Sequence, residues 1–366
     1  MKTLFSTLAV LTLTACSPNP KQPLSSAFFY WETTLDISES EHGLMDSLGC
    51  KKLYIKVLDI GRNAETGEIE PYSLTEISDT GGLAGLEIIP TVFITNEVFQ
   101  NISEEKTGWL AKKIAVSLPF TRHSPQGEGG LGHSLQGEGG LVKTTAFLFD
   151  CDWTPSTRES FFLFLKKIRA ELRPGTSLEA TIRLHQYKFP NRTGVPPVDR
   201  GMLMFYNTGD VDEEGERNTI FHPDDALKYV DGAPKNYPLP LDLALPLFSW
   251  GLVFREGELW KIVPGPMPFE EMRQSKKYLE HPATEPFSAC LWEVKDGTFL
   301  GGHYLRPGDH LRVSTTSPEL LFRAASLAQK LDLANDAVLA FFHLGIARSE
   351  HFSAQQLDSV CKTVRK

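Results

Sequence analysis

The sequence predicts an α/β protein: a (β/α)8 TIM barrel with a small inserted α+β subdomain between strands 7 and 8. Eight apolar, β-rich segments recur along the 366 residues, and helical patterns separate most of them. No glycine-rich phosphate loop follows the first segment, which disfavours an open doubly wound sheet. The predicted strands are Ala27–Thr34, Lys52–Ile60, Glu87–Asn96, Thr145–Trp153, Leu178–Gln186, Gly201–Asn207, Leu239–Ser249 and Ala337–Gly345.

Residues 1–15 are predicted to be a lipoprotein signal peptide. Lys2 supplies a positive charge, and Leu4–Leu13 is apolar but too short to span a bilayer. Leu13-Thr14-Ala15-Cys16 has the form of a lipobox, the cleavage site of bacterial lipoproteins. The mature chain would then begin at a lipid-bearing Cys16, which anchors it to a membrane without spanning it. An ordinary secretory signal with a chance cysteine is the alternative.

Residues 16–26, rich in proline and serine, are predicted to be an extended tether, and residues 27–366 the barrel domain. Ser17 and Pro18 follow the cysteine, where an aspartate retains some bacterial lipoproteins at the inner membrane. We therefore expect a bacterial cell-envelope lipoprotein that is anchored in the outer membrane and faces the periplasm.

Composition narrows the range of partners. The formal net charge is −9 and no basic stripe occurs, so nucleic acid is not an expected partner. No compact metal-ligand motif is present, and we expect neither a metal nor a cofactor. Oligomeric state is left open, as is any disulfide pairing among the four widely spaced cysteines after Cys16, which are Cys50, Cys151, Cys290 and Cys361.

Three helices are clear in the pattern. Ser156–Leu172 places apolar side chains on one side and basic ones on the other, and it starts beside Pro155 with several hydroxyl residues that are suited to capping. Ser317–Leu331 and Ser353–Val364 also begin at a capping serine. Each of these helices follows a predicted strand or the insertion described below, as a barrel requires.

Two segments interrupt the alternation of strands and helices. Residues 121–143 contain a tandem decapeptide, at 123–132 and 133–142, which predicts a flexible glycine-rich loop. Residues 250–316 predict the inserted subdomain, which we expect to wall one side of the face where barrel active sites lie. Its expected hairpins are Leu252–Phe254 with Leu259–Val263, and Leu291–Val294 with Thr298–Tyr304.

Charged side chains cluster near the carboxyl ends of three predicted strands. Alternation along the strands directs toward the barrel interior Lys56 from the second, Asp150 and Asp152 from the fourth, and Arg183 and His185 from the fifth. Paired acids in such a place suit acid–base chemistry. A structural ion-pair network inside the barrel is the alternative.

Two motifs give a family resemblance. Asp150-Cys151-Asp152-Trp153-Thr154 is similar to the fourth-strand signature of family 18 glycoside hydrolases, the chitinase-like barrels, which reads Asp-x-x-Asp-x-Asp-x-Glu. Met204-Phe205-Tyr206-Asn207 is similar to Met-x-Tyr-Asp on that family's sixth strand. The family's catalytic Glu falls on Thr154, whose hydroxyl is not an acid near pH 7, and its first Asp falls on Phe147.

The chain also resembles bacterial envelope lipoproteins of unassigned activity that have this barrel. The segments that carry this resemblance are Thr181–Gln186, Gly194–Asn207 and Pro238–Asp242. This second resemblance implies a fold and a location, and it implies no particular activity.

The resemblance to family 18 implies a glycan site at the carboxyl ends of the strands. Asp152 and Asp150 are the candidate catalytic residues, with Asp152 as the acid. Asp150 would raise the pKa of Asp152 and Arg183 would oppose that shift, so the direction stays open. The candidate substrate-binding residues are Lys56, Trp153, Arg183, His185, Tyr206, Asn207 and His343.

Three functions remain open at this stage. In the first, the barrel is an atypical glycoside hydrolase with reassigned roles. In the second, it binds carbohydrate without cleaving it, with Trp31, Trp153, Tyr206 and Trp250 as stacking surfaces. In the third, it is a structural or assembly lipoprotein. The prediction is a lipid-anchored envelope protein that recognises or atypically processes a glycan.

Overall fold

The computed structural model describes residues 24–77, 83–118, 143–345 and 352–365. The predicted signal peptide, the lipid-bearing Cys16 and the larger part of the 16–26 tether lie outside the described residues. So does the 121–143 repeat loop except for Lys143.

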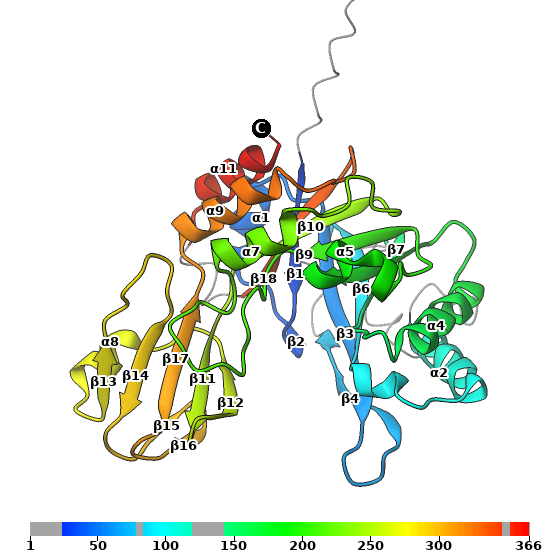
Figure 1. Cartoon of the computed structure of the whole chain (residues 1–366). Helices are drawn as coiled ribbons and strands as arrows, with labels where there is room; N and C mark the ends of the chain where they lie inside the picture. Colours follow the sequence, from blue (N-terminus) through cyan, green and yellow to red (C-terminus); the bar gives the residue numbers. More distant parts are fainter. Residues whose placement is uncertain (1–23, 78–82, 119–142, 346–351, 366) are drawn as a thin grey trace, which may run out of the picture.

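Eight parallel strands form a closed barrel, which confirms the predicted fold class (Figure 1). Strand β1 pairs with both β3 and β18, and these two pairings close the sheet. The barrel strands are β1 (Ser25–Tyr30), β3 (Lys52–Arg62), β6 (Glu87–Ile94), β7 (Ala146–Asp150), β8 (Ser177–Arg183), β9 (Arg200–Met204), β10 (Leu241–Pro246) and β18 (Val338–Leu344). Each overlaps a predicted strand, because strands buried on both faces read as apolar runs.

Helices connect most of the strands. They are α1 (Glu39–Ser47), α2 (Glu104–Ser117), α4 (Arg158–Glu171), α5 (Leu184–Lys188), α6 (Pro190–Thr193), α7 (Pro223–Val230), α9 (Pro318–Ala328) and α11 (Ala354–Val364), with a 3-10 turn η2 (Asn96–Phe99). The side chains of Ser317 and Ser353 accept from backbone N–H groups at the starts of α9 and α11, as their sequences predict. Helix α4 buries Phe161, Leu165 and Ile168 against the barrel.

The connection from β3 to β6 is different, because β3 continues past the barrel into an antiparallel pairing. Strand β4 (Ile69–Leu74) pairs with the end of β3. Strand β5 (Glu76–Ile77) pairs with β2 (Thr34–Leu35), which follows β1. In Figure 1 the β3–β4 hairpin and the inserted subdomain project from the same end of the barrel on opposite sides.

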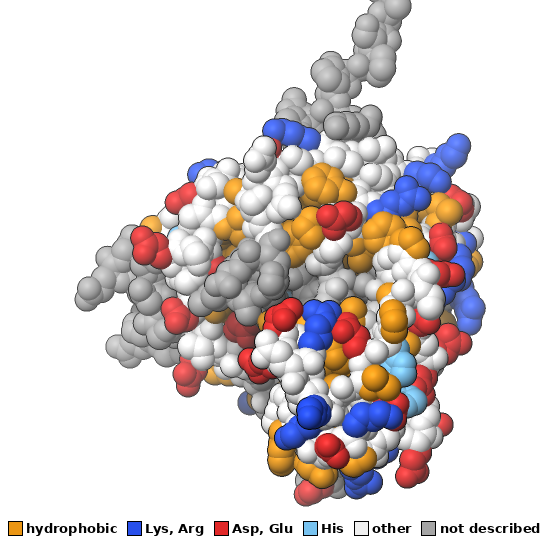
Figure 2. Space-filling model, turned by 90° about the vertical axis from the view of Figure 1, so that its left-hand side faces the viewer, with side chains coloured by type: hydrophobic (Ala, Val, Ile, Leu, Met, Phe, Trp, Pro, Cys, Tyr) orange, Lys and Arg blue, Asp and Glu red, His pale blue; other side chains and the backbone are white. Residues whose placement is uncertain are grey.

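The inserted subdomain is a five-stranded antiparallel sheet in the order β12-β11-β17-β14-β13. Its elements are β11 (Ser249–Arg255), β12 (Glu258–Pro264), α8 (Phe269–Gln274), β13 (Tyr278–His281), β14 (Cys290–Val294), β15 (Thr298–Leu300), β16 (His303–Leu305) and β17 (His310–Thr315). It has its own apolar core, which includes Val253, Trp292 and Leu311. Side chains of both charge signs are interspersed with hydrophobic ones on the surface seen in Figure 2.

One of the two predicted hairpins in this subdomain is correct and the other is wrong. Strands β11 and β12 pair as expected. Strand β14 pairs with β13 and β17 instead of with the segment that follows it. That segment forms its own hairpin, β15–β16, because Gly301 and Gly302 both adopt positive φ and close a two-residue turn.

Two further features are the length and polarity of the helices and the state of the cysteines. Within the described ranges, none of the helices combines the length and apolar character that crossing a membrane requires. Cys50, Cys151, Cys290 and Cys361 are all free thiols.

Candidate functional site

The acid pair of the sequence lies at the carboxyl end of β7. Asp150 is the last residue of the strand, its side chain is buried, and its Oδ1 accepts a hydrogen bond of 2.7 Å from Thr181 Oγ1 on β8. The side chain of Asp152 is 45% exposed. Arg183, at the end of β8, donates from Nε to Oδ1 of Asp152 and from Nη2 to Oδ2 at 2.5 Å. The structure therefore brings together Asp150, Asp152 and Arg183 as predicted.

The electrostatic environments of Asp150 and Asp152 do not match the catalytic roles that the sequence predicts for them. Burial, and then the neighbouring carboxylate of Asp152, raise the pKa of Asp150 to about 6. Both oxygens of Asp152 are engaged by a bidentate guanidinium, a strong and geometrically specific contact. The carboxyl group with the raised pKa is thus the buried Asp150, whereas the half-exposed Asp152 was expected to be the acid.

Thr154, at the position of the family's catalytic Glu, belongs to the turn that leads into α4. Its Oγ1 lies 2.8 Å from Ser156 Oγ, and its backbone N–H donates to Thr157 Oγ1 at 2.9 Å. The Thr157 hydroxyl also donates to Asn96 Oδ1 at 2.5 Å. Thr154 is therefore part of a local hydroxyl network, and its hydroxyl does not act as an acid at neutral pH.

Lys56 lies at the mouth of the barrel, where it pairs with an acid that the sequence analysis missed. Its Nζ donates to Asp59 Oδ2 at 2.8 Å, both side chains are buried, and Nζ lies 5.8 Å from the centre of the Trp31 ring. Residues three apart on a regular strand face opposite sides. The register of β3 against β6 shifts between Lys56 and Leu58, and this irregularity brings Asp59 to the side of Lys56.

Trp153 is not a surface for ligands, and its predicted role in substrate binding is wrong. The indole is 0% exposed, stacks on Phe161 of α4 with centroids 5.4 Å apart, and donates from Nε1 to the Thr193 carbonyl at 3.0 Å. Strand β7 ends at Asp150, so strand alternation no longer decides the direction of this side chain. Trp153 instead fills the space between the barrel and helices α4 and α6.

The two histidines also differ from expectation. His185 is not a strand residue, because β8 ends at Arg183 and α5 begins at Leu184, so its placement inside the barrel by alternation is wrong. His185 lies at the surface. Neighbouring protein atoms remove part of its hydration and lower the pKa of the imidazole, and the carboxylate of Asp152 opposes this shift. His343, at the end of β18, is buried, and its Nδ1 lies 2.8 Å from the Leu344 carbonyl and 4.0 Å from Glu32 Oε1.

Aromatic rings border the acids at the mouth of the barrel. Phe342 of β18 contacts Trp31 with centroids 5.1 Å apart, stacks on Tyr206 at 5.4 Å, and meets Phe248 edge-on at 5.6 Å. Trp250 packs edge-on against Phe248 at 5.4 Å. Trp31, Trp250 and Phe342 are each partly exposed. We call these three residues the aromatic rim.

Tyr206 and Asn207 follow β9 and bring polar atoms beneath the rim. Tyr206 is buried, and burial raises its pKa well above the ordinary value. Within the described part of the chain, Tyr206 Oη and Asn207 Oδ1 are buried without a hydrogen-bond partner. Unsatisfied buried polar atoms are unusual, and a ligand or water is a common partner for them. Tyr206 is therefore too buried to stack on a ligand, and its hydroxyl lacks a hydrogen-bond partner among the described residues.

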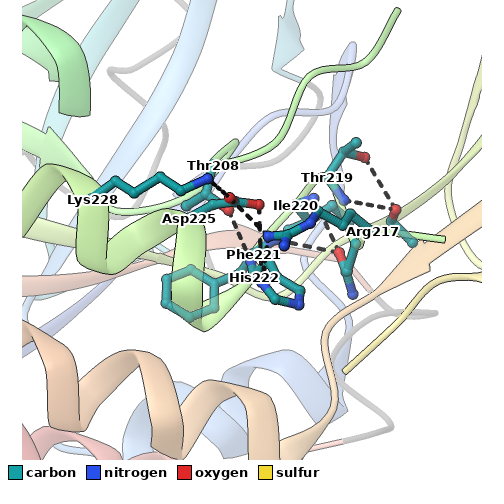
Figure 3. A network of polar contacts seen from close by, with 10 residues as sticks. Thr208, Arg217, Thr219, Ile220, Phe221, His222, Asp225 and Lys228 are labelled. Carbon is teal, nitrogen blue, oxygen red and sulfur yellow. Dashed lines mark hydrogen bonds and ion pairs between the residues drawn. The ribbon is translucent and has the colours of Figure 1, made fainter. Parts of the chain in front are cut away.

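Trp250 is held in place by the loop between β9 and α7. Its Nε1 donates to Thr219 Oγ1 at 3.0 Å, and Thr219 in turn contacts Ser314 of β17. On the other side of this loop, Arg217 and Lys228 point toward the carboxylate of Asp225, at 2.9 and 2.6 Å (Figure 3).

Buried Arg312 of β17 fastens the same loop from the inserted subdomain. Its guanidinium donates to the backbone carbonyls of Asp210, Val211 and Glu213. The loop therefore connects the subdomain to the barrel and sets the position of one side of the rim.

Within the described ranges, no three His, Cys, Asp or Glu side chains are grouped so that they could hold a metal ion.

The sequence matches no family model, and no curated protein sequence matches it. Solved structures with a similar fold include a chitinase from Rhizomucor miehei, at 12% identity and a TM-score of 0.50, covering 93% of this chain and 100% of that one. A chitinase from Bacillus thuringiensis matches at 11% identity and a TM-score of 0.50, covering 94% of this chain and 70% of that one.

The C-terminal domain of a candidate chitinase from Desulfitobacterium hafniense matches at 11% identity and a TM-score of 0.52, covering 94% of this chain and 100% of that one. At such identities the similarity establishes the fold. The protein has a (β/α)8 barrel fold similar to the folds of these chitinases.

Proposed function

We propose that the protein recognises a glycan at the carboxyl ends of its barrel strands without hydrolysing it. The observation that carries this proposal is the bidentate pair of Arg183 with Asp152, set beside the partly exposed aromatic rim. Aromatic faces and a few convergent polar groups are the usual lining of a small-molecule site. The resemblance of residues 150–154 to the family 18 signature supports a sugar as the ligand.

The arrangement of the acids argues against turnover. Thr154 replaces the proton donor of the resembled motif, and Arg183 occupies both oxygens of Asp152. General acid catalysis contributes about 10²- to 10⁴-fold to rate, and hydrolysis without it would be correspondingly slow. Arg183 and Asp152, whose side chains are 21% and 45% exposed, remain suited to orienting the hydroxyl and amide groups of a sugar.

A specific observation favours a second candidate function, atypical hydrolysis with Asp150 as the acid. A pKa of about 6 lies in the range of tuned catalytic carboxyl groups. Its side chain is only 5% exposed and bonded to Thr181, which limits its access to a glycosidic oxygen. We therefore rank hydrolysis below binding.

Calorimetric titration with N-acetylglucosamine oligosaccharides and peptidoglycan fragments, alongside an assay of released reducing ends, separates these functions. Binding without release is expected. Trp31→Ala should weaken binding about tenfold, because an aromatic contact is worth about 0.5–1.5 kcal/mol and 1.4 kcal/mol is a factor of ten.

Trp109→Ala on α2, where the tryptophan is also exposed, is the matched control and should have no effect on binding. Release of reducing ends by the unmodified protein, abolished by Asp150→Asn, would establish hydrolysis instead. Absence of binding to every fragment would favour a structural or assembly role.

We also propose that the protein is anchored through lipid on Cys16 in the bacterial cell envelope, in the outer membrane and facing the periplasm. The lipobox at residues 13–16 supports this proposal. Cys16→Ala should move the protein from the membrane fraction to the soluble fraction. Retention of the variant in the membrane fraction would refute the anchor.

A further inference from the structure

A cavity lies on the β3–β4 hairpin, which extends from the end of β3 beyond the barrel. It has a volume of about 620 Å³ and is lined by Arg62, Asn63, Glu70, Tyr72, Glu97 and Gln100 together with backbone and small residues. None of these residues belongs to the site described above. The cavity is large enough for a sugar ring, and pockets of about 300–1,000 Å³ are typical for small ligands.

Tyr72 gives this cavity an aromatic face. Its side chain is 56% exposed although it sits close to the backbone of Gly61, where an added Cβ would lie 3.1 Å from two carbons of the ring. A larger residue at position 61 would press against the ring. The glycine therefore lets the tyrosine ring lie against β3 while its other face remains open, as a stacking surface for a flat ligand requires.

The cavity is held in shape before any ligand arrives. The Arg62 guanidinium donates to four backbone carbonyls, those of Glu97 at 2.8 Å, Gly67 at 2.9 Å, Val98 at 3.2 Å and Gln100 at 2.9 Å. These bonds join the hairpin turn to η2. Asn63 adds a bond of 2.7 Å to Glu70 Oε1. A preformed site loses less entropy when a ligand binds.

The charges around the cavity select against an anionic ligand. Backbone carbonyls accept four hydrogen bonds from the Arg62 guanidinium, so most of its five N–H donors are used within the protein while its positive charge remains. Glu70 and Glu97 line the cavity, and burial together with Asp59 and Glu97 raises the pKa of Tyr72 to about 12. The two carboxylates thus outnumber the one guanidinium in the lining of the cavity, which disfavours an anion there. A ligand here is accordingly neutral or positively charged, with hydroxyl groups that donate to carboxylates.

Contacts connect the cavity to the candidate site. Lys56 lies over the ring of Trp31 in the rim and pairs with Asp59. Asp59 in turn pairs with Ser73 of β4, the residue that follows Tyr72, in the register of the β3–β4 hairpin. The hairpin projects beyond the strand ends on the side opposite the inserted subdomain (Figure 1).

We propose that the cavity around Tyr72 is a separate binding subsite for a pyranose unit that carries no negative charge, in the same glycan that contacts the aromatic rim. This inference rests on the proposed function for its ligand. It adds a direction along which the glycan runs, from Trp31 toward the β3–β4 hairpin, and it excludes sugars with a carboxylate from the hairpin end.

The test compares short and long N-acetylglucosamine oligosaccharides by calorimetric titration. The unmodified protein is expected to bind the hexasaccharide about tenfold more tightly than the disaccharide. Tyr72→Ala should remove that gain and leave disaccharide affinity unchanged, whereas Tyr72→Phe, which keeps the ring, should retain the gain. Leu74→Ala is the matched control, since Leu74 lies on the same strand and is also 56% exposed.

The outcomes separate the inference from the proposed function. An unchanged hexasaccharide affinity in Tyr72→Ala, with normal disaccharide binding, overturns the subsite alone. If neither oligosaccharide binds the unmodified protein, the proposed function fails, and the cavity is then tested by itself. For that purpose 3-fluorotyrosine is incorporated in place of Tyr72, and its fluorine resonance is followed while methyl β-glucoside is added. A shift supports a sugar subsite, and no shift at millimolar glucoside overturns it.

Charge selectivity is the second readout. Glucuronic acid should shift the same fluorine resonance less than methyl β-glucoside does, and Glu97→Gln should reduce the difference. Equal responses to the two sugars would overturn the exclusion of anionic units.

Discussion

The two ends of the barrel interior carry the same kinds of side chain in different surroundings. At the carboxyl ends of the strands, Asp150 and Asp152 lie beside Arg183. Toward the amino ends, Glu179 of β8 and Asp242 of β10 lie near Arg200, whose Nη1 bonds Asp242 Oδ1 at 3.0 Å. Both ends thus combine buried or partly buried acids with an arginine, and at the amino end Asp336, which bonds Arg200 Nη2 at 2.6 Å, belongs to the same group.

The charged side chains at the two ends of the barrel differ in how far they are exposed to solvent. Glu179 and Asp242 are both buried, and one oxygen of each has no hydrogen-bond partner within the described residues. At the other end Asp152 and Arg183 are partly exposed and adjoin the aromatic rim. In barrel enzymes the carboxyl-end face carries function and the amino-end face carries stability. Residue type alone therefore does not identify a site, whereas access and neighbouring aromatic rings do.

The largest expected difference between the two ends comes from removing each arginine. Arg200→Met leaves Asp242 as a buried, uncompensated charge and should lower the free energy of unfolding by about 3–5 kcal/mol. Arg183→Met removes the partner of the half-exposed Asp152 and should cost only about 1 kcal/mol. Urea denaturation of both variants at pH 7 measures the two losses in the free energy of unfolding. Equal losses would mean that the two ends do not differ in energetic role.

Neutralising one acid at each end should give a smaller effect that depends on pH. Burial raises the pKa of Glu179 to about 7 from an ordinary value of 4.5. Between these values the folded chain binds more protons than the unfolded chain, so stability falls as pH rises through this window and is then constant. Glu179→Gln should therefore raise the free energy of unfolding by about 1–3 kcal/mol at pH 8 and leave it almost unchanged at pH 4.

Asp150→Asn is the counterpart at the carboxyl end. The pKa of Asp150 is raised to about 6 from 3.8, so this variant should also gain stability at pH 8. Glycan affinity should fall in Asp152→Asn, whose side chain is 45% exposed and holds Arg183, and it should be retained in Glu179→Gln. Urea denaturation at pH 4 and pH 8, followed by calorimetric titration, checks these variants. If Glu179→Gln also weakened binding, the separation of stability from ligand recognition would be wrong.

The barrel and the acid pair could be predicted because both depend on local patterns. Apolar runs marked all eight strands. Alternation on β8 placed Arg183 toward the interior, and the same alternation pointed to Glu179, a signal that the sequence analysis did not use. Alternation applies only inside a strand, however. It failed for His185, which lies in the helix turn after β8. The ligand-binding role of Trp153 was expected from the family resemblance and not from alternation, and the buried indole contradicts that role.

Two other features depend on contacts that no local pattern contains. Asp59 joins Lys56 because the register of β3 shifts against β6, a property of the neighbouring strand. The partner of β14 is chosen among strands distant in sequence, so the predicted hairpin with residues 298–304 was wrong. The β3–β4 cavity likewise requires the turn of the hairpin to meet η2, and this contact depends on Arg62 and the carbonyls of another segment.

The smallest expected effect concerns the position that separates this barrel from the resembled hydrolases. Thr154 is half-buried at the surface, so Thr154→Glu should change the free energy of unfolding by no more than about 0.5 kcal/mol. It supplies a carboxyl group where the resembled motif has its acid. We expect no turnover of N-acetylglucosamine oligosaccharides, because Arg183 still engages both oxygens of Asp152.

The double variant Thr154→Glu with Arg183→Met frees Asp152, and a reducing-end assay compares it with the single variant. Turnover in the double variant alone would assign the loss of hydrolysis jointly to the threonine and the ion pair. Turnover in the single variant would refute the idea that the ion pair blocks the chemistry. The carboxyl end of the barrel would then differ from a catalytic site by one side chain.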